Sequence, residues 1–193
     1  MVTGTPLDYS RYFWQGEKVK LRPMRMEDAE QRFIDSLDSP SRQVLQMGIE
    51  LPTSVELERS AMEKYAGCKD ADGVIMFAIE NAEGINVGGI SLHGRDEKNG
   101  LFSFGVVISL EHRRKGYAEE AIRILLKYGF RERRYQKCDS ACAHTNDGSI
   151  ALHRKLGFIE EGRRSRELFF NGEYYDSLLF GMTREEFDAK ETG

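Results

Sequence analysis

Apolar and polar residues follow two different spacings along the chain, and together these spacings predict both strands and helices. Alternation with a period of two, or an apolar run between turn signals, predicts a strand. Such strands are expected at residues 17–24, 74–80, 85–93, 102–109, 137–143, 158–170 and 173–182. Apolar residues at helical spacing predict helices at residues 26–37, from Ser54, from about Gly116, at 146–156 and at 184–190. This order of elements predicts an α/β (α+β) domain.

The pattern also predicts which helix faces point inward and where the chain turns. The inward face of the first helix is expected to consist of Ala29, Phe33, Ile34 and Leu37. The second helix is expected to carry Leu57, Ala61 and Tyr65 on one side. Between these helices, Pro40 and Ser41 are expected to break the chain. Gly88–Gly89 predicts a bulge or a close contact within a strand, and Asn171–Gly172 predicts a hairpin turn.

Length and composition bound the domain organisation. The chain has 193 residues, of which 40% are hydrophobic and 31% charged, as expected of one domain with its own core. Residues 17–190 are expected to form that domain. Residues 1–16 form an aromatic-rich lead-in that covers either the domain's own surface or a second subunit, which leaves a homodimer open.

Charge and the lengths of apolar runs argue against several classes of protein. A net charge of −4 argues against nucleic acid as a partner. The longest apolar run, at residues 74–79, is far too short to span a membrane, and the N-terminal segment lacks the pattern of a signal peptide. Three cysteines cannot form a disulfide framework. We therefore expect a cytoplasmic protein with free thiols and no membrane partner.

Two of the cysteines raise the question of a metal site. Cys138 and Cys142 share one strand face with Ser140 and His144, because alternate strand residues point the same way. A zinc site would need a tighter cysteine spacing and two further ligands. Buried thiols that pack as small apolar groups are the expected reading, and no metal site is predicted.

Residues 102–129 combine an apolar strand, a basic turn and a helix in a pattern that predicts anion binding. The first backbone N–H groups of a helix have no partner within the helix and can bind phosphate. Small residues at Gly116 and Ala118 let a pyrophosphate approach the backbone. The candidate ligands are Arg113, Arg114, Lys115, Gly116, Tyr117 and Ala118. The alternative is an ordinary basic surface turn, because short glycine motifs are not specific.

Residues 146–156 place three polar side chains on one stripe of a predicted helix. Asn146, Ser149 and His153 are three and four residues apart, so they fall on the same face. Each also has a structural alternative: Asn146 as a helix cap, Ser149 as a second cap or a surface hydroxyl, and His153 as a packed histidine. Because the stripe lies one loop away from the predicted phosphate site, the three residues are candidate catalytic residues.

Three segments together resemble the GNAT N-acetyltransferases. The turn R113-x-x-G116-x-A118 is similar to that family's acyl-CoA pyrophosphate loop, and residues 146–158 are similar to its N-x-x-[SA]-x-x-x-Y-x-x-x-G-F segment. Residues 162–182 resemble the hairpin of the RimJ/RimL-like branch, which includes ribosomal-protein and spermidine acetyltransferases. The resemblance implies the GNAT fold, with about seven mostly antiparallel strands flanked by helices and splayed between strands 4 and 5.

The resemblance also implies a mechanism with acetyl-CoA as co-substrate. Backbone groups of Val107 and Ile108 would pair with the pantetheine arm, and a backbone N–H there would polarise the thioester carbonyl. Asn146 would also lie on the cofactor side. An acceptor amine, on a protein N-terminus, a polyamine or a small molecule, would attack the thioester directly in a ternary complex. His153 or Ser149 would then protonate the departing thiolate.

Two residues depart from the family pattern. His153 stands where many relatives carry a tyrosine acid, and Ser103 stands where many carry a glutamate. Serine is not a general base, so a water molecule or a different carboxylate would have to take the proton of the amine. The same departures would fit a non-catalytic acyl-CoA sensor or regulatory subunit. Steady release of CoA in the presence of an amine separates the two.

Overall fold

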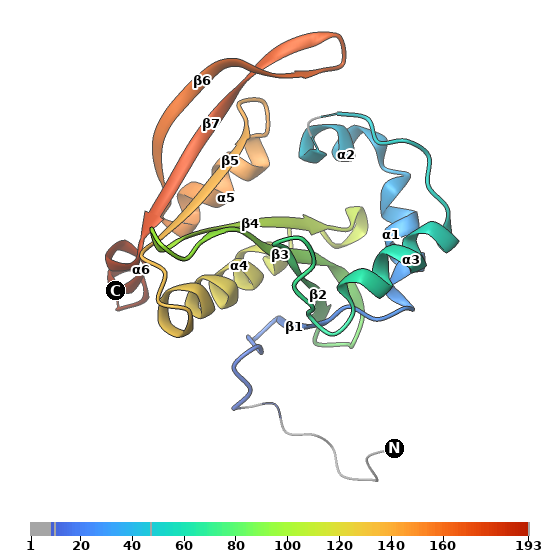
Figure 1. The fold of residues 1–193 in the computed structure, drawn as a ribbon, viewed down its shortest axis with the longest axis horizontal. Helices are drawn as coiled ribbons and strands as arrows, with labels where there is room; N and C mark the ends of the chain where they lie inside the picture. The colour runs from blue at the N-terminus through green and yellow to red at the C-terminus, as the bar shows by residue number, and fades with distance from the viewer. Residues whose placement is uncertain (1–8, 10, 47, 193) are drawn as a thin grey trace.

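The computed structural model describes residue 9 and residues 11–46 and 48–192. Within them, seven strands form one sheet in the order β1-β2-β3-β4-β5-β7-β6 (Figure 1). The strands are β1 (Val19–Pro23), β2 (Ile75–Asn81), β3 (Asn86–Asp96), β4 (Leu101–Ile108), β5 (Lys137–Ala143), β6 (Ile159–Phe170) and β7 (Glu173–Thr183). Only β4 and β5 pair in parallel. The expected mixed, mostly antiparallel sheet is confirmed.

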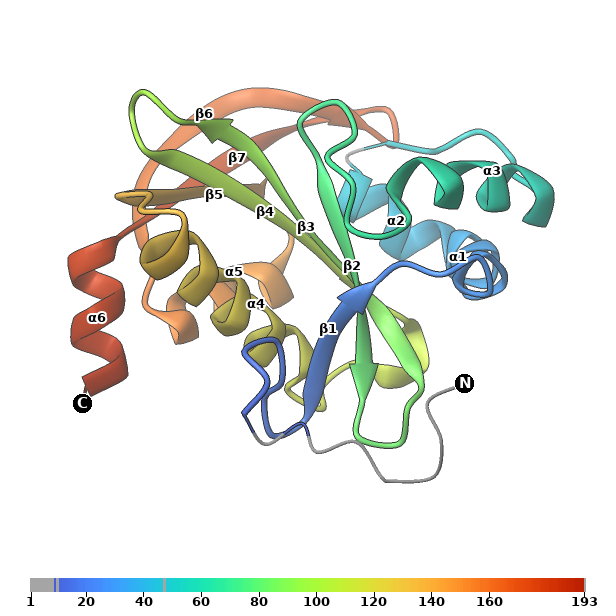
Figure 2. The same cartoon turned by 60° about the horizontal axis from the view of Figure 1, so that its bottom comes forward.

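Helices cover both faces of this sheet. They are α1 (Asp28–Ser36), α2 (Ser39–Gln46), α3 (Val55–Tyr65), α4 (Tyr117–Lys127), α5 (Asp147–Leu156) and α6 (Arg184–Thr192), with the short helical turns η1 (Leu110–His112) and η2 (Tyr128–Glu132). Figure 2 shows α1 and α3 on one side of the sheet and α4 and α5 on the other. The N-terminal caps fit the sequence, since the side chain of Ser54 accepts the backbone N–H of Leu57 at 3.2 Å.

The break expected at Pro40 and Ser41 is wrong, because both residues lie in the first turn of α2. Proline is tolerated there since the first N–H groups of a helix have no acceptor within it. The backbone N–H of Arg42 already donates to the carbonyl of Asp38 at 2.9 Å. The chain therefore has one helix more than the pattern predicted between the first two strands.

Three apolar residues of these helices are exposed, and two of them, Ile34 and Leu37, were expected to point inward. Ile34, Leu37 and Leu57 have 57%, 66% and 60% of their surface exposed. Ile34 and Leu37 line a pocket next to the end of β4 rather than packed core, so nothing covers their outer sides. On α3, Met62 is the fully buried residue. Helical periodicity located an apolar side of these helices but could not show where the sheet beneath them ends.

The two faces of the sheet carry hydrophobic clusters of unequal size. Under α4 and α5, a large cluster includes Phe102, which stacks on Tyr135 with ring centroids 5.2 Å apart. Trp14 of the lead-in stacks on Phe77 at 5.1 Å, so this part of the lead-in lies on the domain's own surface; residues 1–8 and 10 lie outside the described residues. Under α1 and α3, the buried cluster is small and consists of Met24, Ala29, Met62 and Ala78. The α1 face thus has room for pockets.

Strands β4 and β5 splay apart, as expected. They pair only from Leu101 to Ser103 on β4 and from Lys137 to Asp139 on β5. Beyond these residues β5 continues alongside β7, while β4 continues alongside β3. The divergence is visible in Figure 1 and leaves one edge of β4 without a neighbouring strand in the described part of the chain.

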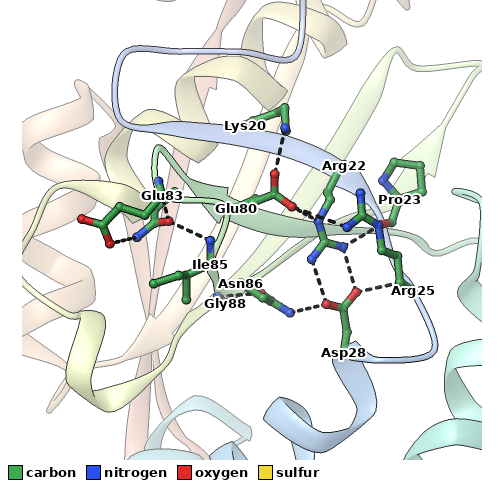
Figure 3. A network of polar contacts seen from close by, with 11 residues as sticks. Lys20, Arg22, Pro23, Arg25, Asp28, Glu80, Glu83, Ile85, Asn86 and Gly88 are labelled. Atoms are coloured by element: carbon green, nitrogen blue, oxygen red, sulfur yellow. Dashed lines mark hydrogen bonds and ion pairs between the residues drawn. The ribbon is translucent and has the colours of Figure 1, made fainter. Parts of the chain in front are cut away.

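A buried ionic network anchors α1 to the sheet. Arg22 donates to both carboxylate oxygens of Asp28 at 2.9 Å and to Glu80 at 2.5 Å (Figure 3). Lys20 also pairs with Glu80 at 2.8 Å, and Asn86 donates to Asp28 at 2.8 Å. Burial alone would lower the pKa of Arg22, but the hydrogen bonds to the two carboxylates raise it overall. Because Asp28 begins α1, the network fixes the start of α1 against β1, β2 and β3.

Candidate active site

The edge of β4 that faces β5 is free from Phe104 to Ile108. On the other edge, β3 pairs Gly89 with Val107 and Gly88 with Ile108. A Cβ at Gly88 would lie 2.1 Å from the carbonyl oxygen of Val107, so only glycine allows this approach. The predicted close contact at Gly88–Gly89 is confirmed. The free edge can accept an extended ligand as an added strand.

The turn after β4 presents the N-terminus of α4. Gly116 precedes the helix with φ +86°, a left-handed conformation that favours glycine. The first N–H groups of α4 therefore point out of the turn without an acceptor in the helix. The side chains of Arg114 and Lys115 are exposed, and neither forms an ion pair with a described residue. This turn has the backbone donors and the charge that phosphate binding requires.

Arg113, predicted as a phosphate ligand, points back into the protein. Its Nε donates to the carbonyl of Ile108 at 2.9 Å and its Nη1 to Oγ of Ser41 at 2.7 Å. Its Nη2 pairs with Asp38 at 3.0 Å. The guanidinium thus ties the end of β4 to the start of α2. Arg114 and Lys115 are the cations of this turn that remain available to a ligand.

Lys18 lies beside the same turn, although sequence reasoning did not single it out. The carboxylate of Glu120, in the first turn of α4, accepts the backbone N–H groups of Glu17, Lys18 and Val19 at 2.7–2.9 Å. This contact holds the start of β1 against α4. A Cβ at Gly116 would lie 2.9 Å from Nζ of Lys18. No sequence signal connects positions 18 and 116, because only the tertiary structure brings them together.

The stripe predicted on α5 is present. Oδ1 of Asn146 accepts the backbone N–H of Ser149 at 3.0 Å and caps the helix. Oγ of Ser149 lies 3.3 Å from Nδ1 of His153, so the three side chains do meet. Gly157 ends the helix in a left-handed conformation with φ +100°, as its position predicted.

The imidazole of His153 is buried, with 4% of the residue exposed. It stacks on Phe180 with ring centroids 4.6 Å apart and lies 5.9 Å from Phe104. Nδ1 donates to the carbonyl of Ser149 at 2.8 Å, and Nε2 then accepts the hydroxyl of Ser140 at 2.8 Å. Burial lowers the pKa of His153, which keeps the ring neutral at pH 7. With both nitrogens engaged, this geometry favours the packed alternative over a proton donor.

Two pockets lie on the other face of β4, beneath α1 and α2. Their volumes are about 420 and 330 Å³, and both are lined by Gln31, Asp35 and Val107, so we treat them as one space, the α1–β4 cleft. The larger pocket has an apolar rim of Ile34, Leu37, Pro40 and Leu110. The smaller pocket lies over the sheet and is lined by His93 and Gly105 among others. The cleft therefore reaches β4 at Val107, one of the two residues predicted to hold the pantetheine arm.

Asp35 lies where the two pockets meet. Its carboxylate accepts the hydroxyl of Ser109 at 3.0 Å and the side-chain amide of Gln31 at 3.0 Å. Within the described residues it has no lysine or arginine partner, whereas Asp38 pairs with Arg113. A half-buried carboxylate held by neutral donors can bind a cation. Sequence reasoning missed Asp35 because a polar residue near a helix end carries no signal of its own.

Cysteine and metal chemistry find little support in the described part of the chain. Cys138 and Cys142 are buried, and burial raises the pKa of both thiols, so neither is a thiolate nucleophile near neutral pH. Among the described residues, no three potential metal ligands gather. No helix of that part of the chain is long and apolar enough to cross a membrane.

Comparisons with known proteins identify a family for this chain. A family model described as acetyltransferase (GNAT) domain matches residues 18–159. The SPbeta prophage-derived uncharacterized N-acetyltransferase YokL of Bacillus subtilis (strain 168) is 36% identical over 176 residues, which cover 91% of this chain and 96% of that protein. The spermidine N(1)-acetyltransferase of Escherichia coli (strain K12) is 28% identical over 172 residues, which cover 89% of each.

Solved structures show the same fold. The spermidine N-acetyltransferase from Vibrio cholerae, solved in complex with CoA and spermine, superposes with a TM-score of 0.76 at 22% identity and covers 89% of this chain and 99% of that one. The family model covers most of the chain, and the sheet splays where that family was expected to bind its co-substrate. This chain therefore belongs to the GNAT acetyltransferases and is an acyl-CoA-dependent N-acetyltransferase with acetyl-CoA as co-substrate.

Proposed function

We propose that this enzyme acetylates a primary amine of a polycationic acceptor by direct attack in a ternary complex. The observation that carries the proposal is that β4 is accessible from two sides near Val107. One side is the free edge toward β5, next to the turn at the N-terminus of α4. The other side is the α1–β4 cleft. Two substrates can thus meet at one strand, which direct transfer requires.

Acetyl-CoA occupies the β5 side in this proposal. The backbone of Val107 and Ile108 pairs with the pantetheine arm and polarises the thioester carbonyl. The backbone from Gly116 through Tyr117 to Ala118 holds the pyrophosphate, supported by the charges of Arg114, Lys115 and Lys18. Arg113 has a positioning role here, because its hydrogen bonds to Ile108, Ser41 and Asp38 hold the turn in place.

The acceptor occupies the α1–β4 cleft. Asp35 has no cationic partner in the described chain, so a second positive charge of the acceptor can pair with it while the reacting amine lies near Val107. The apolar rim next to Asp35 fits the methylene segments between the amines of a polyamine. Similarity to the E. coli spermidine acetyltransferase also supports this acceptor class.

The reaction forms an amide and releases CoA. The neutral amine attacks the thioester carbonyl, the C–N bond forms and the C–S bond breaks. We assign protonation of the departing thiolate to the hydroxyl of Ser149, which His153 and the Asn146 cap hold in position. His153 itself has both ring nitrogens engaged.

A screen of amines with release of free CoA thiol as the readout tests the proposal. Spermidine or spermine should be turned over with a lower KM than a monoamine or a short peptide with a free N-terminus. Asp35→Asn keeps the shape of the side chain but removes its charge. It should raise the KM for the polyamine about tenfold or more and leave the KM for the monoamine nearly unchanged.

Two results would contradict the proposal in different ways. Turnover of the peptide alone would move the acceptor to protein N-termini. No CoA release with any amine, despite acetyl-CoA binding, would favour the non-catalytic alternative.

A further inference from the structure

We infer that His93 is the general base of this transfer, the group that takes the proton from the attacking nitrogen. The inference rests on the proposed amine acetylation, and the experiment below separates the failure of the two. The sequence alone predicted water or a different carboxylate in this role, since Ser103 offers no base.

His93 is at the right place in the sheet. It pairs with Ser103 across β3 and β4, and its ring lines the smaller pocket of the α1–β4 cleft together with Gly105 and Val107. A Cβ at Gly105 would lie 3.6 Å from Cε1 of His93 and 3.1 Å from Oγ of Ser91. Glycine at 105 therefore leaves space for the ring to lie close to β4.

The hydrogen bonds around His93 leave one nitrogen free. Nδ1 lies 3.3 Å from Oγ of Ser91, and that hydroxyl lies 3.5 Å from the carbonyl of Gly105, which can only accept. If Ser91 donates to Gly105, its oxygen accepts from Nδ1–H and the lone pair of the imidazole is on Nε2. Nε2 has no hydrogen-bond partner among the described residues and is not among their buried unpaired atoms, so it is accessible on a residue that lines the cleft.

The distance along β4 suits a proton transfer next to the thioester. His93 lies beside Gly105, and the backbone proposed to hold the thioester is at Val107, two residues further on. Two strand residues span about 7 Å. An amine nitrogen between the ring and the thioester carbonyl is thus within hydrogen-bond reach of the ring, directly or through one water.

The surroundings keep the ring neutral and able to accept a proton. Burial lowers the pKa of His93. The charged residues that line the same pocket come from α1 and α2, and they are Arg32, Asp35 and Arg42. Both arginines are paired, with Glu58 at 3.0 Å and Glu50 at 2.6 Å. The residues of β2 and β4 that line the pocket are uncharged.

The proton balance fits a base of this strength. The acceptor ammonium first loses one proton to solvent. As its nitrogen bonds to the carbonyl carbon, it becomes far more acidic, and Nε2 of His93 takes its second proton. The C–S bond then breaks, the thiolate takes a proton from Ser149, which is restored from solvent, and His93 returns its proton to solvent. One ammonium and one acetyl-CoA give one amide, one CoA thiol and one released proton.

His93→Gln tests the inference, because glutamine is polar and of similar size but is not a base. With the best amine of the screen, kcat should fall about 100-fold or more, while the Kd for acetyl-CoA and the melting temperature stay near those of the wild type. The kcat of the wild type should fall at acidic pH, with an apparent pKa below 6.5. This fall, the acidic limb of the pH–rate profile, should vanish in the variant. His93→Ala should regain activity with added imidazole.

His144→Gln is the matched histidine control. The ring of His144 accepts the backbone N–H of Asp176 and does not line the cleft, so this variant should keep the acidic limb. The inference is overturned if the folded His93→Gln variant keeps its kcat. It is also overturned if that variant loses kcat but keeps the acidic limb, and imidazole does not restore the activity of His93→Ala. A wild type that releases no CoA with any amine defeats the proposed function instead.

Discussion

Two histidines on opposite faces of the sheet show how position decides the chemistry of one residue type. His153, on α5, packs in the large core between aromatic rings, and both of its nitrogens are hydrogen-bonded. His93, on β3, lines a pocket, and among the described residues only its Nδ1 has a partner. Burial lowers the pKa of both rings. The difference therefore lies in which ring atoms remain available to a substrate.

Sequence pattern singled out only His153 of this pair. His153 lies in a recognisable segment and was a candidate acid, whereas His93 is one polar residue in an alternating strand. Alternation predicts the face of a strand but not whether that face meets core or cleft. The variants below test whether the two histidines differ as their surroundings indicate.

His153→Ala should have the largest effect, and the effect should be on stability. Removing a buried ring leaves a cavity and an unpaired Ser140 hydroxyl, which together cost about 2–5 kcal/mol. The kcat at a temperature where the variant is folded should fall less than tenfold. Denaturant unfolding and CoA-release kinetics measure the two quantities.

His153→Phe is the matched control, since it keeps the ring stack but lacks both nitrogens. It should recover much of the stability lost in the alanine variant. A stable alanine variant whose kcat falls about 100-fold would instead restore His153 as the acid and break the comparison.

Gly116→Glu sharpens the comparison on the cofactor side. A carboxylate there occupies the place proposed for the pyrophosphate and faces Lys18, so acetyl-CoA affinity should fall about 100-fold, close to 2.7 kcal/mol. Calorimetric titration with acetyl-CoA measures it. Gly116→Ala carries the same left-handed backbone strain without the charge, and it should lose much less affinity. Equal losses in both variants would place the effect in the backbone rather than in the phosphate site.

The smallest expected effect is a dependence of stability on mildly acidic pH. Because burial lowers the pKa of His153 in the folded state, the unfolded chain binds that proton more readily. The stability due to the neutral ring is complete above the unfolded pKa of about 6.5 and is lost as the pH falls toward the folded value. Melting temperatures from pH 8 to pH 5 should fall more steeply for the wild type than for His153→Phe. Parallel curves would show that the pKa of His153 is the same in the folded and the unfolded chain.

Much of the fold was predictable from the sequence because its signals are local. Ser54 and Asn146 cap helices, Gly116 and Gly157 take left-handed conformations, and each acts within a few residues of itself. The stretch from β4 to α4 likewise joins a strand, a turn and a helix without help from elsewhere. The cofactor side proposed here is therefore built from elements that the sequence predicts.

The side chains that are available at the site were decided only by the tertiary structure. The sequence predicted Arg113 as a phosphate ligand, but in the structure its guanidinium donates to Asp38 and Ser41, which belong to a distant segment of the chain. Lys18 reaches the turn only because Glu120 holds the start of β1. The burial of each side chain, its ion pairs and the space between α1 and β4 depend on contacts between segments that are far apart in the chain. Such contacts leave no local pattern in a single sequence.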